Sequence, residues 1–198
     1  MIDVTRRQFT SRGLVGLGLA LSSKPLTLAA AQANSNPETL SLPQWQVVDA
    51  ITQCIIPSVD GLGAKEAHCV NFIDKALTRE ESAHLNRYQE GLGRLESACQ
   101  ARYGASFTAL DVGDQIKLLE YLEDGTLEEW EPTEQRIWFG ALWYHTILGF
   151  ASAPRFGGNN HLTGWRVMNF PGHLHEAGGI SDAQVQGIEP IKWTFDAH

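Results

Sequence analysis

The stretch from Ile137 to Phe150 constrains the fold more than any other part of the sequence, because a helix formed here carries apolar side chains on almost every side. Pro132 and Glu134 precede it, and a proline and an acid in a first turn are typical of a helix start. A helix without a polar face either lies at the centre of a core or is covered by another protein. We therefore expect a helix from Pro132 to about Phe150, in one of these two settings.

Four further helices are predicted from apolar residues that recur at every third or fourth position. Ser41 can cap the first, which Pro57 ends. The second spans about 65–77 and the third about 80–103, and Asp111 can cap the fourth.

The end of the chain lacks this periodicity. Residues 153–172 are rich in glycine, proline and asparagine and are expected to be irregular, and residues 173–198 contain turn-forming residues. No segment alternates apolar and polar residues as a strand does. The predicted class is mainly α: one helical domain of about five helices over residues 34–198, with an irregular C-terminal segment.

Residues 1–33 are predicted to be an export signal of the twin-arginine type. They contain, in order, two arginines before an aromatic residue, a weakly apolar run and small residues suited to cleavage: Arg6, Arg7, Phe9, Gly13 to Leu28, Ala31 and Ala33. Glycines and a Ser-Ser-Lys-Pro sequence interrupt the run, which makes it a poor transmembrane helix. Because this route carries folded proteins, we expect a folded chain in the periplasm, with the signal cleaved after one of the two alanines or kept as an anchor.

The charge balance excludes one class of partner. The formal net charge is -8, and cleavage of the signal removes four basic residues, Arg6, Arg7, Arg12 and Lys24. So acidic a chain has no electrostatic basis for binding nucleic acid or an anionic membrane surface.

The sequence shows little that could carry a reaction. The glycines from Gly13 to Gly18 lie in the signal with no strand before them, which argues against a dinucleotide site. Motifs for covalent haem c, for phosphate cradling and for a serine nucleophile are missing. His145 lies on the apolar helix, where a hydrogen-bonded core histidine is favoured over a catalytic base. His173 and His175 could begin a metal site, but no further ligands complete it, and the acids from Glu128 to Glu131 suggest a solvated face. We assign no catalytic, cofactor-binding or metal-binding residue to this chain.

Three cysteines, Cys54, Cys69 and Cys99, are too few for a disulfide scaffold. An oxidising compartment could pair any two of them. Buried free thiols are the alternative, and the sequence does not choose.

Two groups of residues carry a family resemblance. The more specific group comprises Trp143-Tyr144-His145-Thr146, Gly149 to Asn159, Gly164-Trp165 and Phe170-Pro171-Gly172. The weaker group comprises Ile55-Ile56-Pro57-Ser58, Asp60, Gly63 to Ala67 and Phe72-Ile73-Asp74. From about Gln44 to Gly172 the chain resembles subunit 3, the small subunit, of the gluconate 2-dehydrogenase type. Ala153 departs from this family, which often has an acid there.

The resemblance implies a non-catalytic partner of a larger flavoprotein from the glucose-methanol-choline oxidoreductase group. That partner would hold FAD and oxidise gluconate, a glucoside at C3 or a related sugar, and a third subunit with haem c often accepts the electrons. The catalytic subunit tends to lack an export signal, so the small subunit would assemble with it and take it through the twin-arginine translocase. The complex would lie in the periplasm, or at the membrane through its other subunits. Two alternatives stay open: a subunit that adds residues near the substrate entrance of its partner, and a self-sufficient histidine- or metal-dependent enzyme.

The partner interface is predicted on the loop that follows the apolar helix. Aromatic residues on ordered loops are typical binding anchors, and an arginine can pair with a partner carboxylate. The predicted interface residues are Phe150, Pro154, Arg155, Phe156, Gly157, Gly158, Asn159, Trp165 and Phe170. Two alternatives stay open: the loop folds back on its own helices, or Arg155 caps the end of the apolar helix within its own chain.

Overall fold

The computed structural model describes residues 37–128 and 130–170, together with residues 186 and 188. These residues form α-helices and short 3-10 turns, and their only β feature is an isolated bridge between Val59 and Leu62. The prediction of a mainly α fold is confirmed. The predicted export signal, with Arg6, Arg7 and Phe9, lies outside the described residues, as do His173 and His175.

Helix α2 (Leu42–Ile55) begins as its sequence predicts. The Ser41 hydroxyl accepts a hydrogen bond from the Gln44 backbone nitrogen at 3.5 Å, and the Gln44 side chain accepts one from the Ser41 nitrogen at 3.0 Å. This reciprocal pair satisfies two backbone donors at a helix start. Val48, Ile51 and Ile55 point into the core.

Helix α3 (Cys69–Thr78) is shorter than predicted. The expected start near residue 65 is wrong because His68 takes a left-handed conformation (φ 55°) and breaks the helix there. The residues before it turn back on α2, where the Ala64 nitrogen donates to the Ile56 carbonyl at 3.0 Å.

Helices α4 (Leu85–Tyr103) and α5 (Val112–Asp124) follow. A 3-10 turn, Ser82–His84, replaces the predicted first turn of α4, and Gly104 ends this helix in the left-handed region. Asp111 caps α5 by accepting from the Asp114 nitrogen at 2.9 Å.

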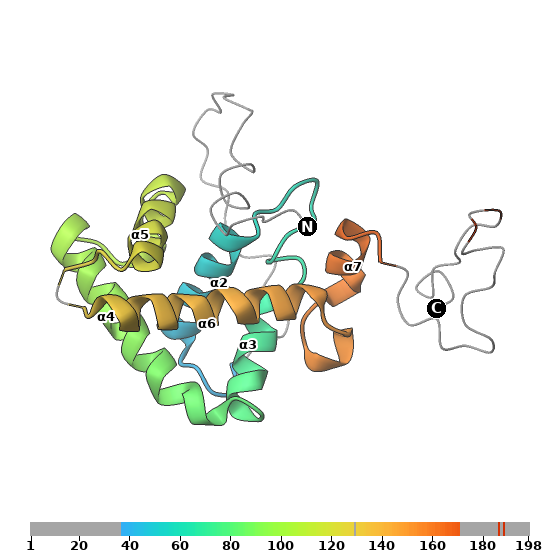
Figure 1. Ribbon diagram of the computed structural model, residues 1–198, viewed down its shortest axis with the longest axis horizontal. Coiled ribbons are helices and arrows are strands. Elements are labelled where there is room, and N and C mark those ends of the chain that lie inside the picture. Colours follow the sequence, from blue (N-terminus) through green and yellow to red (C-terminus); the bar gives the residue numbers. More distant parts are fainter. Residues whose placement is uncertain (1–36, 129, 171–185, 187, 189–198) are drawn as a thin grey trace.

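Helix α6 (Pro132–Ala151) lies across the other helices, with α7 near its C-terminal end (Figure 1). It packs against α2, α3, α4, α5 and α7, so it forms the centre of the core. Trp138, Phe139 and Leu142 are buried, but Ile137 and Tyr144 are half exposed. The helix is therefore central and still has one apolar side that the described residues leave open.

The segment after α6 is less irregular than predicted. It contains 3-10 turns at Pro154–Phe156 and Asn160–Leu162 and a short helix, α7 (Thr163–Val167). None of the helices in the described ranges is long and apolar enough to cross a membrane.

The three cysteines are free thiols, so the possible disulfide is absent. Burial raises the pKa of the Cys54 thiol to about 11 and those of Cys69 and Cys99 to about 12. Thiols in this state are poor nucleophiles.

Candidate partner-binding surface

The loop after α6 folds back onto the helices of its own chain. The Asn159 backbone nitrogen donates to the Gly149 carbonyl at 2.7 Å, and the Asn160 nitrogen donates to the Ala67 carbonyl at 3.0 Å. On α3, the Asn71 side chain donates to the Gly157 carbonyl at 2.7 Å. These bonds fix the loop against α3 and α6.

The side chain of Asn159 forms hydrogen bonds to the backbone on both sides of the loop. Its side chain is fully buried, and its Nδ2 donates to the Ser152 carbonyl at 2.8 Å. Its Oδ1 accepts from the backbone nitrogens of Gly164 at 2.8 Å and Trp165 at 3.4 Å. One amide therefore joins the end of α6 to the start of α7.

Two glycines allow this close packing. A Cβ at Gly158 would lie 2.2 Å from the Gly149 carbonyl oxygen, and one at Gly164 would lie 1.7 Å from that of Phe150. Any side chain at either position would push the loop off α6. Gly158, one of the predicted interface residues, is therefore buried against its own chain.

Trp165 is also turned inward. Its ring is 6% exposed, its Nε1 donates to the Ala151 carbonyl at 2.8 Å, and its ring meets Phe170 edge-on at 5.1 Å. Phe150 is equally buried. Trp165, one of the predicted interface residues, is thus buried within its own chain, because a carbonyl at the end of α6 provides the partner that a buried indole requires.

Of the predicted interface residues, Pro154, Arg155, Phe156 and Phe170 are exposed. The Arg155 guanidinium lies 4.9 Å from the centre of the Phe156 ring, and 46% of Phe156 is exposed. Asn159 and Trp165 donate hydrogen bonds to carbonyls in the last turn of α6. They therefore cap this helix end, which is the role that the alternative prediction gives to Arg155. The sequence did not show this role, because it depends on contacts across the loop.

A second exposed apolar region lies on α6. Ile137, Ala141, Tyr144 and Leu148 follow each other along one side of the helix, and we call them the α6 strip. Ile137 is 50% exposed and Tyr144 is 54% exposed, while the other two are partly exposed. Between Ile137 and Ala151 the helix has no Asp, Glu, Lys or Arg. The strip is thus an uncharged ridge.

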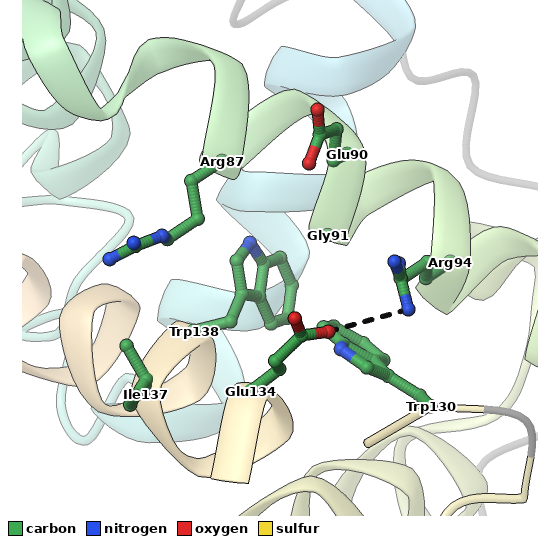
Figure 2. Close-up of a pocket in the computed structure, with 8 residues that line it drawn as sticks. All are labelled: Arg87, Glu90, Gly91, Arg94, Trp130, Glu134, Ile137 and Trp138. Carbon is green, nitrogen blue, oxygen red and sulfur yellow. Dashed lines mark ion pairs between the residues drawn. The ribbon is translucent and has the colours of Figure 1, made fainter. Parts of the chain in front are cut away.

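A small pocket of about 120 Å³ lies between α4 and the first turns of α6 (Figure 2). Its lining comprises Arg87, Glu90, Gly91, Arg94, Trp130, Glu134, Ile137 and Trp138. Arg94 pairs with Glu134 at 3.5 Å, and its guanidinium lies 5.8 Å from the centre of the Trp130 ring. Ligand pockets in proteins are typically about 300–1,000 Å³, so this one suits a single side chain better than a sugar.

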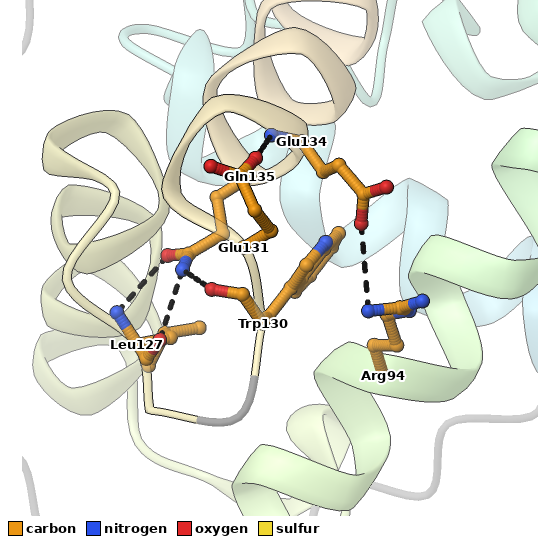
Figure 3. Close-up of polar contacts among 6 residues, drawn as sticks. All are labelled: Arg94, Leu127, Trp130, Glu131, Glu134 and Gln135. Carbon is orange, nitrogen blue, oxygen red and sulfur yellow. Dashed lines mark hydrogen bonds and ion pairs between the residues drawn. The ribbon is translucent and has the colours of Figure 1, made fainter.

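The side chain of Gln135 fixes the connection between α5 and α6 through hydrogen bonds to its backbone (Figure 3). Its Oε1 accepts from the Leu127 nitrogen at 3.0 Å, and its Nε2 donates to the Leu127 carbonyl at 2.9 Å and to the Trp130 carbonyl. Glu128 and Glu131 are exposed as expected, whereas Trp130 between them is buried and residue 129 lies outside the described residues.

His145 lies in the core. Its Nδ1 is 2.5 Å from the Tyr88 hydroxyl, and the imidazole is 5% exposed. Burial lowers the pKa of His145, opposed by the charge of Glu81 and assisted by that of His84. The geometry is that of a hydrogen-bonded core histidine. Within the ranges that the structure covers, no three side chains of His, Cys, Asp or Glu converge as metal ligands.

The model of one protein family, described as gluconate 2-dehydrogenase subunit 3, matches residues 43–172. No curated protein and no solved structure matches the chain.

Proposed function

The chain belongs to the gluconate 2-dehydrogenase subunit 3 family, and from this premise we propose that it is the small, non-catalytic subunit of an FAD-dependent dehydrogenase of the glucose-methanol-choline type. The family is that of a subunit in a multi-subunit dehydrogenase complex. We place the oxidation of gluconate, a glucoside or another sugar in the partner, which would hold the FAD, with haem c in a third subunit. The match over residues 43–172 is the observation that carries this proposal.

The chemistry of the described residues supports a non-catalytic role. The three thiols are held protonated by burial, and His145 is buried against Tyr88. The pocket between α4 and α6 is smaller than a sugar site needs. These groups are therefore poorly placed to act on a substrate.

The second part of the proposal is export. Residues 1–33, with Arg6, Arg7 and Phe9, would direct the folded heterodimer through the twin-arginine translocase to the periplasm. The described fold contains no disulfide, so it needs no oxidising compartment to form. This fits a chain that folds and binds its partner in the cytoplasm.

The third part is the interface. A partner held through transport needs a large and well-packed contact. In the described ranges, most of the large apolar side chains that stay exposed lie between Ile137 and Phe170. Arg155 and Phe156, stacked on the outside of the loop, are placed to anchor a partner, and Phe170 extends this surface.

The test is co-expression with the catalytic subunit. Changing Arg6 and Arg7 together to lysine should leave the FAD-bearing subunit in the cytoplasm, because the translocase reads the arginine pair. Arg12→Lys, in the same segment, is the matched control and should export normally. Full periplasmic dehydrogenase activity with the double variant would refute the export role.

A further inference from the structure

The α6 strip contains two exposed large apolar side chains, Ile137 and Tyr144, on a helix whose Trp138, Phe139 and Leu142 are buried. Its four residues are spaced by four, three and four positions, which places them on one line of roughly 16 Å along the helix. Trp143 and Ile147 flank the line and are half-buried. Apolar side chains that lie together on a protein surface are typical of interaction sites.

The shape of the strip suits another helix. Gly140 and Ala141 lie between the two large exposed side chains, Ile137 and Tyr144, so the ridge is low in its middle. Helices pack with axes about 8–10 Å apart, and small residues at the crossing point allow the closest approach. A partner helix with apolar residues at every third or fourth position can place one large side chain in this low point.

The charge at one end of the strip restricts the partner further. Ile137 lines the pocket between α4 and α6, and so does Arg87, which is exposed. Arg94 is already engaged by Glu134 and Trp130, whereas Arg87 has no ion pair within the described ranges. The pocket has room for one side chain beside Arg87, and an acidic one would pair with it.

We propose that the α6 strip binds an amphipathic helix of the catalytic subunit, whose acidic residue pairs with Arg87. This inference rests on the proposed function and adds a contact region that is separate from the loop with Arg155 and Phe156. A second copy of this chain fits less well, because each copy carries a formal net charge of -8 and two copies repel.

A photo-cross-linker tests the occupant directly. We would place p-benzoylphenylalanine at position 144 of the full chain, co-express it with the catalytic subunit and map the cross-linked peptides. The same probe at Val112, which is 63% exposed on α5, is the control. Position 144 should cross-link to a helical peptide of the catalytic subunit, and position 112 should not. Cross-links to residues 171–198 of the same chain, to a second copy, or none from an intact complex would overturn the inference.

Affinity measurements separate this inference from the proposed function. Ile137→Asp combined with Tyr144→Asp should weaken binding of the catalytic subunit about tenfold or more, with the melting temperature of the free subunit unchanged. Arg87→Glu should weaken binding and reduce its dependence on salt. Val59→Asp, at a position that is 66% exposed, is the control and should bind as the wild type does. If the wild-type complex forms and the strip and Arg87 variants bind equally well, the inference fails while the proposed function stands. If the wild-type chain binds no flavoprotein, both fail.

Discussion

The side-chain amide of Gln135 pairs with both backbone groups of Leu127, accepting from its nitrogen at 3.0 Å and donating to its carbonyl at 2.9 Å. Both residues are buried. The amide therefore replaces the backbone partner that this connection between α5 and α6 does not have.

Replacing Gln135 by leucine should lower the free energy of unfolding by about 3 kcal/mol, because buried backbone groups of Leu127 and Trp130 lose their partner. Gln100→Leu, at an exposed position on α4, is the control and should change it by less than about 0.5 kcal/mol. Denaturant unfolding of both variants measures the difference. Equal stability of the two would contradict the role assigned to Gln135.

Asn159→Asp should loosen the loop after α6. The new carboxylate can still accept from Gly164 and Trp165, but it cannot donate to the Ser152 carbonyl. The expected loss is about 1–3 kcal/mol, with faster hydrogen exchange at residues 157–165. Asn86→Asp, on the exposed side of α4, should leave this exchange unchanged.

Local signals in the sequence predicted most helix ends correctly. Ser41, Asp111 and Pro132 mark the starts of α2, α5 and α6, and Gly104 marks the end of α4. Each signal acts on backbone groups within a few residues, so it can be recognised without tertiary structure.

Long-range contacts account for what could not be predicted. Trp165 is buried because the Ala151 carbonyl accepts its indole nitrogen, and no local pattern indicates that pairing. The left-handed His68 that shortens α3 is another case, because its conformation follows from how residues 59–67 meet α2. Composition suggested an irregular loop, but packing against α6 orders it.

Stability should fall in mild acid, and His145 should account for part of the fall. Burial lowers its pKa in the folded chain below the value of about 6.5 in the unfolded chain, so the unfolded chain binds the proton more readily. The stability that neutral His145 contributes is complete above about pH 6.5 and is lost as the pH falls through its folded pKa.

His145→Gln tests this, since glutamine can still accept from Tyr88 but does not titrate. Unfolding curves measured from pH 7.5 to pH 5 should show a weaker pH dependence for this variant. Burial also lowers the pKa of His68, which should account for a further part of the fall in stability. A variant with glutamine at both His68 and His145 should therefore show an even weaker pH dependence. A wild-type slope in both variants would contradict the assignment.

The loop after α6 should divide into residues that affect binding and residues that affect folding. Arg155→Ala and Phe156→Ala should weaken binding of the catalytic subunit without changing the melting temperature, because both side chains are exposed. Trp165→Ala should instead lower the free energy of unfolding by about 3–5 kcal/mol. If the Arg155→Ala complex still assembles and shows an altered KM, Arg155 acts near the substrate entrance of the partner, and an unchanged KM argues against that role.

Two glycines on α4 should respond to alanine in opposite directions. A Cβ at Gly91 would lie 2.0 Å from Nε1 of Trp138, which itself donates to the Tyr88 carbonyl at 3.3 Å. Gly91→Ala should therefore push α4 away from α6 and cost about 1–3 kcal/mol. A Cβ at Gly93 meets nothing within 4 Å, so Gly93→Ala should stabilise the helix by up to about 1 kcal/mol. Thermal unfolding of the two variants compares close packing with helix propensity on the same helix, and a shift in the same direction for both would mean that α4 does not contact Trp138 as described.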